Sequence, residues 1–173
     1  MIGITLNNYQ IELNQLSSDY LAASPLLKSQ YDIGIIAIAI GNEEPASNIS
    51  QMNDGMIYAK NLIKTGKLPK NAKVTTVLTN NNSDWVISTY LPMNARFTEN
   101  FLEIYSNMDI ICFNLYDWYS NPGLSLPVRL SFGSTLPSVT LNGFGAIRFA
   151  IDAAIKIEPN FVDKPFWCTE IGW

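Results

Sequence analysis

The side chains best suited to chemistry lie where predicted strands end. Glu43 follows Gly41 and Asn42 after an isoleucine-rich run, and Glu170 follows a second apolar run. The sequence contains no histidine, which excludes Ser-His-Asp and Cys-His nucleophile systems and histidine-ligated metal sites within this chain. Acid–base catalysis must therefore rest on carboxylates, lysine, tyrosine or a thiol, with carboxylates foremost. The alternative is that Glu43 lies in a solvated acidic loop and Glu170 is a surface acid.

Composition narrows the classes of protein. The chain has 173 residues, of which 47% are hydrophobic, so it can bury a sizeable core. Its net charge is −4 with scattered basic residues, which gives no sign of nucleic-acid binding or a polybasic membrane surface. No apolar run approaches the roughly 18 residues of a membrane span, and the first residues do not resemble a signal peptide. We expect Cys112 and Cys168 to be reduced core residues, since two cysteines make neither a disulfide framework nor a zinc site.

Strand and helix patterns alternate along the chain. Five strands are predicted, at residues 2–6, 35–40, 73–79, 108–115 and 165–170. Helical spacing of apolar residues covers residues 11–27, 49–63, 97–105 and 147–155, with Pro25 limiting the first helix and Gly66 capping the second. Residues 120–141 contain several glycines and prolines and predict a long connection that could serve as a lid or binding loop.

Strands joined by helices imply parallel pairing, either in an open doubly wound sheet or in a (β/α) barrel. An open dinucleotide-binding sheet normally carries a glycine-rich loop after its first strand, and Asn7-Asn8-Tyr9-Gln10 holds that place here. A barrel collects functional groups from several strand ends, as Glu43, Tyr116 and Glu170 would do. We therefore predict one domain over residues 1–173, an incomplete α/β barrel of the (β/α)8 TIM type with five strands, and no cofactor or metal.

Four short motifs match a known family in the right order, each one βα unit from the next. They are Ile38-Ala39-Ile40-Gly41-Asn42-Glu43, then Lys73-Val74-Thr75-Thr76, then Asn114-Leu115-Tyr116 with Asp109 upstream, and finally Thr169-Glu170-Ile171-Gly172-Trp173. Through them the chain resembles glycoside hydrolase family 17, the β-1,3-glucanases and related glucanosyltransferases, which are (β/α)8 barrels. The resemblance covers strands three to seven of that barrel. Asp117 departs from the proline that is common after the sixth-strand tyrosine.

The resemblance implies roles for individual residues. Glu43 would be the acid/base and Glu170 the nucleophile of a retaining double displacement, with Asn42 directed at the sugar 2-hydroxyl and Tyr116 at the nucleophile. Such a reaction needs two carboxyl groups about 5–5.5 Å apart, one protonated and one ionised. Glu44 is predicted to be a bystander, because strand alternation turns it away from Glu43 and Pro45 follows.

The aromatic residues have two interpretations. Trp118, Tyr119 and Trp173 would either lie against the apolar faces of sugar rings or cap the barrel core. Trp85 and Tyr90 are predicted to belong to the core or rim.

Two classes of function follow. The first is a retaining hydrolase or transglycosylase acting on β-glucan oligosaccharides or polysaccharides. The second is a truncated, non-catalytic remnant of such a barrel that binds carbohydrate or another protein. Neither class requires nucleic acid or a membrane span, and open barrel edges would favour self-association. By resemblance the protein would be secreted or associated with the cell wall, although the chain begins without a signal peptide.

Overall fold

The computed structural model describes residues 1–79, 84–87, 95–115, 136–157 and 161–171, with the side chains at 136–146 and 170–171 left out. The described chain divides into two compact units. The first contains residues 1–77 and 104–111, and the second contains residues 78–103 and 112–173.

The five predicted strands are present and form one sheet in the order β1-β2-β3-β6-β7. Their bounds are β1 (Ile2–Ile4), β2 (Ala37–Asn42), β3 (Lys73–Thr79), β6 (Ile111–Leu115) and β7 (Phe166–Ile171). β2 pairs in parallel with β1 on one side and with β3 on the other. The first strand was predicted to reach residue 6, but it ends at Ile4 because residues Leu6–Asn8 turn into a short 3-10 helix that buries Leu6.

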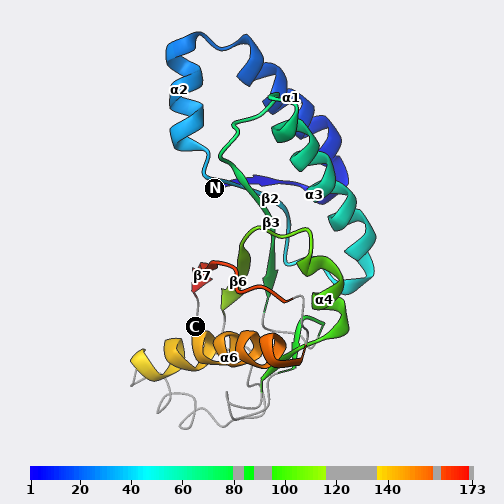
Figure 1. The fold of residues 1–173 in the computed structure, drawn as a ribbon, viewed down its shortest axis with the longest axis vertical. Helices are drawn as coiled ribbons and strands as arrows, with labels where there is room; N and C mark the ends of the chain where they lie inside the picture. Colours follow the sequence, from blue (N-terminus) through cyan, green and yellow to red (C-terminus); the bar gives the residue numbers. More distant parts are fainter. Residues whose placement is uncertain (80–83, 88–94, 116–135, 158–160, 172–173) are drawn as a thin grey trace. The chain divides into compact units, whose positions relative to one another are not determined.

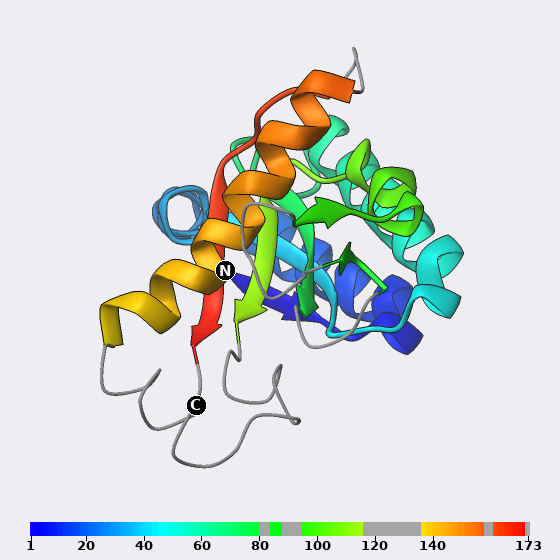
Figure 2. The ribbon, with the colours of Figure 1, turned by 90° about the horizontal axis from the view of Figure 1, so that it is seen from below.

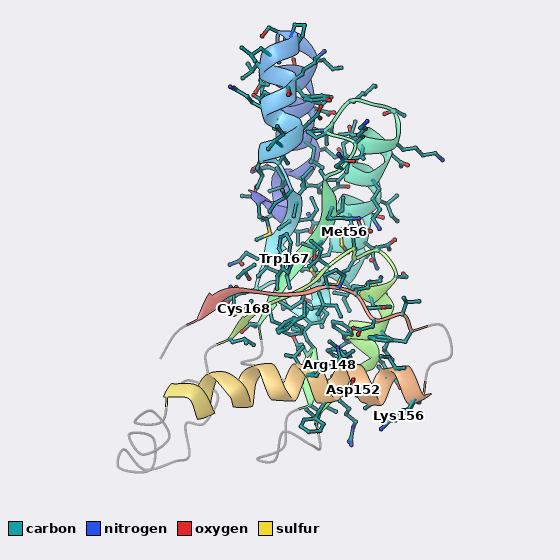
Figure 3. All side chains as sticks on the ribbon, turned by 60° about the vertical axis from the view of Figure 1, so that its left-hand side comes forward. Met56, Arg148, Asp152, Lys156, Trp167 and Cys168 are labelled. Carbon is teal, nitrogen blue, oxygen red and sulfur yellow. The ribbon has the colours of Figure 1, made fainter. Side chains whose placement is uncertain are left out.

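Two helices pack on this sheet in the first unit. α1 (Tyr9–Ala22) and α3 (Ile49–Lys64) lie side by side (Figure 1), and their apolar faces are buried through Leu13, Met52 and Met56. Met56, labelled in Figure 3, is fully buried. The stripe at helical spacing therefore packs in the core, as its periodicity predicts. Gly66 caps α3 with a left-handed φ of 71°, as expected for a glycine after a helix.

The single helix predicted over residues 11–27 is wrong. The chain forms α1 and then a separate helix, α2 (Pro25–Gly34). Ser24 caps α2, accepting a hydrogen bond from the Leu27 amide at 3.4 Å, and Pro25 occupies the first turn. Proline is well suited to that turn, because the N–H it lacks would have no partner within the helix. Pro25 therefore begins a helix instead of limiting one.

The second unit contains an antiparallel hairpin that the sequence pattern did not predict. β4 (Val86–Ile87) pairs with β5 (Arg96–Phe97), and α4 begins only at Glu99 and ends at Tyr105. The helix predicted from residue 97 is therefore wrong at its start. The rings of Phe97 and Phe101 stack with centroids 3.7 Å apart, so their four-residue spacing reflects a core contact between a strand and a helix.

α6 (Leu136–Ile157) forms the long helix of the second unit. It lies along one side of β6 and β7 in both views (Figure 1 and Figure 2), and the residues buried on its described part are Ile147, Ala150, Ile151 and Ala154. The connection predicted over residues 120–141 is too long at its end, since α6 starts at Leu136 and Pro137 lies in its first turn, where proline is tolerated. Residues 120–135 lie outside the described part of the chain.

Smaller features complete the described fold. Cys112 is buried on β6, Cys168 is half-buried on β7, and neither is disulfide-bonded. Trp85, predicted to belong to the core or rim, is fully buried and so belongs to the core, whereas Tyr90 lies outside the described residues. Within the described residues, the helices are too short or too polar to cross a membrane.

Candidate functional site

The carboxyl end of β2 carries a β-bulge. Ala39 pairs with Thr75 and Asn42 pairs with Val77, so three steps along β2 match two steps along β3. One extra residue must be accommodated, and Gly41 does this with a left-handed φ of 75°. Beyond the bulge, the Glu43 amide donates a hydrogen bond to the Val77 carbonyl at 2.8 Å. A bulge of this kind re-aims the side chains that follow it.

Glu43 itself has a left-handed backbone, with φ of 56°. Among the described residues it is the only one other than glycine with positive φ. For a residue with a β-carbon this conformation costs about 1–3 kcal/mol, and it persists only where the surroundings enforce it. Such outliers gather at functional sites. Asn42 and Glu43 are both exposed at this strand end, so their side chains are accessible to a ligand.

Asp109, which belongs to the sixth-strand motif, has a structural role at the opposite end of the strands. Its Oδ2 accepts a hydrogen bond from the Val74 amide at 2.8 Å, and its Oδ1 pairs with Lys60 Nζ at 3.0 Å. The Asp109 amide donates to the Val74 carbonyl at 2.7 Å. These contacts fix the start of β3 against the approach to β6 and connect both to α3.

β6 and β7 are joined by side chains next to a predicted catalytic residue. Thr169 on β7 donates its hydroxyl hydrogen to Asn114 Oδ1 on β6 at 2.5 Å, and the Phe113 carbonyl lies 3.4 Å from the same hydroxyl. Asn114 is fully buried. The sequence pattern singled out Asn114 as part of a motif but gave no contact for it. The only sequence signal for this contact was the position of Thr169 directly before the predicted nucleophile, Glu170.

The predicted site residues fall in different places. Asn42 and Glu43 lie together at the end of β2 in the first unit, and Glu170 lies within β7 in the second unit. Figure 3 shows its neighbours Trp167 and Cys168 on the same strand. Tyr116, Trp118, Tyr119 and Trp173 lie outside the described residues, so their roles stay predictions.

Comparison with solved structures identifies the fold. The first match is CJP38, a β-1,3-glucanase and allergen of Cryptomeria japonica pollen, with a TM-score of 0.56 and 16% identity over 99% of this chain and 59% of that one. The second is a structure of plant β-glucan endohydrolases with distinct substrate specificities, with a TM-score of 0.62 and 15% identity over 100% of this chain and 60% of that one. The fold is that of part of a (β/α)8 barrel.

The similarity to the two glucanase structures covers only part of those proteins. The chain spans about 60% of the length of the glucanases it matches. No protein-family model matches the sequence. No curated protein matches it significantly either. Identities of 15–16% show a shared fold and leave substrate and catalysis to be argued from the residues themselves.

Proposed function

We propose that the chain is a retaining glycoside hydrolase of the family 17 type that cleaves β-1,3-glucosidic bonds of β-glucan. The observation that carries the proposal is the exposed, left-handed Glu43 on the bulge that ends β2. In barrels of this kind the catalytic groups lie at the carboxyl ends of the strands. The fold shared with plant β-glucan endohydrolases supports the choice of substrate.

In this proposal two carboxyl groups have different roles in the reaction, one as nucleophile and one as acid/base. The Glu170 carboxylate attacks the anomeric carbon while Glu43 donates its proton to the departing glycosidic oxygen. A covalent glycosyl-enzyme forms at Glu170. Glu43, now ionised, then takes a proton from water, and the resulting hydroxide equivalent attacks the same carbon and releases the sugar with retained configuration.

The remaining predicted residues would bind the sugar. Asn42, next to Glu43, would hydrogen-bond the 2-hydroxyl, and Tyr116 would orient Glu170. Trp118 and Trp173 would present aromatic planes to the apolar faces of sugar rings. Residues 1–173 act as one partial barrel domain in this proposal.

Replacing each glutamate tests the assignment. Glu170→Ala removes the nucleophile, so activity should fall toward background on every substrate. Glu43→Ala should abolish most activity on laminarin, whose leaving group needs protonation, but should still permit glycosylation by a nitrophenyl glycoside, whose leaving group does not. Asp54→Ala, which removes an exposed carboxylate on α3, serves as the matched control and should leave activity unchanged.

Azide makes the two roles distinguishable by product stereochemistry. In Glu43→Ala, azide attacks the glycosyl-enzyme and gives a glycosyl azide of retained configuration. In Glu170→Ala, azide attacks the substrate directly and gives the inverted product. The opposite pattern would exchange the two roles, and full activity in both variants would remove both residues from the mechanism.

A second candidate is a remnant that binds glucan or a protein without cleaving it, which the 60% coverage of the matched glucanases favours. Laminarin separates the candidates. Release of reducing ends by the wild-type chain supports hydrolysis, whereas binding to laminarin with no reducing ends released supports the remnant.

A further inference from the structure

Glu44, predicted to be a bystander, folds back over the bulge at the end of β2. A β-carbon added to Gly41 would lie 2.8 Å from Glu44 Cγ and 3.5 Å from Glu44 Oε1. The Glu44 side chain therefore covers the face of Gly41 that any larger residue would occupy. Contact with Glu44 and a left-handed φ both favour glycine at this position.

Asn48 holds Glu44 in this position. Its Nδ2 donates a hydrogen bond to Glu44 Oε2 at 2.8 Å, and this contact is half-buried. Asn48 ends the short 3-10 helix η2 (Ala46–Asn48), and its amide donates to the Pro45 carbonyl at 3.0 Å. Asn48 is also the residue immediately before α3, so Glu44 is hydrogen-bonded to the start of a long helix.

α3 is in turn packed tightly on β2. A β-carbon added to Gly55 of α3 would lie 2.5 Å from Ile40 Cγ2, which places the helix backbone directly against the side chain preceding Gly41. The bulge is thus enclosed from two sides. β3 holds it through the Glu43 amide, and Asn48, the residue immediately before α3, holds it through Glu44.

We propose that Glu44 and Asn48 are positioning residues that hold the bulge at Gly41–Glu43 and thereby aim the Glu43 carboxyl group. The catalytic consequence rests on the proposed function, in which Glu43 is the acid/base. The structural part does not depend on it, because a left-handed glutamate needs support whether or not it reacts with a sugar.

Hydrogen exchange of single backbone amides tests the structural part. Glu44→Ala and Asn48→Ala should each speed exchange of the Glu43 amide about tenfold by loosening the bulge locally. Glu44→Gln retains an acceptor for Asn48 and should leave exchange near the wild-type rate. The Lys73 amide, bonded to the Ile36 carbonyl at 3.0 Å in the same unit, should be unaffected. Unchanged exchange at Glu43, or equal acceleration at Lys73, would overturn the proposal.

Kinetics test the catalytic part. Glu44→Ala should lower kcat on a β-1,3-glucan oligosaccharide about tenfold with little change in KM, because a misaimed acid loses proton transfer and not binding. The nitrophenyl glycoside, which needs little protonation, should lose much less. Glu44→Gln should restore most of the rate, and Asp54→Ala should match wild type.

The possible results separate the two proposals. Equal losses on both substrates, or full activity of Glu44→Ala, would contradict a role in aiming Glu43. If the wild-type chain turns over neither substrate, the proposed function fails, and the exchange rate of the Glu43 amide alone decides whether Glu44 and Asn48 hold the bulge.

Discussion

At Thr169 a single hydroxyl group connects two strands beside the proposed nucleophile. Its partner, Asn114 Oδ1, is fully buried, and the 2.5 Å bond lies one residue before Glu170. A hydrogen bond in such a place both stabilises the fold and fixes the register of β7 against β6. Thr169 therefore holds β7, the strand that carries Glu170, against β6.

Thr169→Val keeps the shape of the side chain and removes its donor. We expect the free energy of unfolding to fall by about 1 kcal/mol, as for loss of one hydrogen bond, with the decrease read from the urea midpoint. Thr169→Ser keeps the hydroxyl and should lose less. If Val and Ser variants unfold at the same urea concentration, the hydrogen bond contributes nothing beyond packing.

At the scale of elements, strands and helices with a regular apolar pattern were predicted correctly, whereas bulges and helix breaks were not. The bounds of β3 match the prediction because β3 contains four consecutive β-branched residues, Val74-Thr75-Thr76-Val77, a composition that favours a strand, and α3 follows its apolar stripe. α2 was missed because a proline can either end a helix or occupy the first turn of one, and Pro25 does the second. The bulge in β2 has no periodic signature. Only Gly41 indicated the bulge in the sequence. Asn42 and Glu43 were found because they belong to a motif, whereas the contact between Glu44 and Asn48 that supports the bulge was not predicted.

The close approach of α3 to β2 gives an element-scale prediction. Gly55→Ala places a β-carbon against Ile40 Cγ2 and should lower the free energy of unfolding by about 1–3 kcal/mol, as overpacked cores do. Ile40→Ala removes the obstructing atom, so the double variant should lose less than the sum of the two single losses. A β-carbon added to Gly34 meets nothing within 4 Å, which makes Gly34→Ala the matched control. Strict additivity in chemical denaturation would contradict the contact.

For the whole molecule, the sequence motifs and the structural comparison agree on one architecture. The sheet contains five strands in the order β1-β2-β3-β6-β7 and matches part of a (β/α)8 barrel. The match covers about 60% of the barrel protein's chain. The five strands of this sheet, unlike the β4–β5 hairpin, were accessible from the sequence because strand and helix patterns alternate along the chain. The separation of about 5–5.5 Å between the carboxyl groups of Glu43 and Glu170 that a retaining reaction needs stays a prediction.

The order of the sheet also leaves β1 and β7 as its outermost strands among the described residues. Unpaired strand edges bind other edges, so we expect the 173-residue polypeptide to self-associate as its concentration rises. A lysine on an edge strand opposes such pairing. Gly3 is exposed on β1, and a β-carbon added there meets nothing within 4 Å, so Gly3→Lys can be introduced without a clash.

Gly3→Lys should therefore shift the polypeptide toward monomer while leaving its unfolding cooperative, as measured by sedimentation velocity and chemical denaturation. Gly34→Lys adds the same charge at the end of α2, where a β-carbon also meets nothing, and should leave association unchanged. Equal effects of the two variants would mean that net charge, and not the β1 edge, controls association. A wild-type polypeptide that stays monomeric at every concentration tested would show that the β1 edge does not pair between copies.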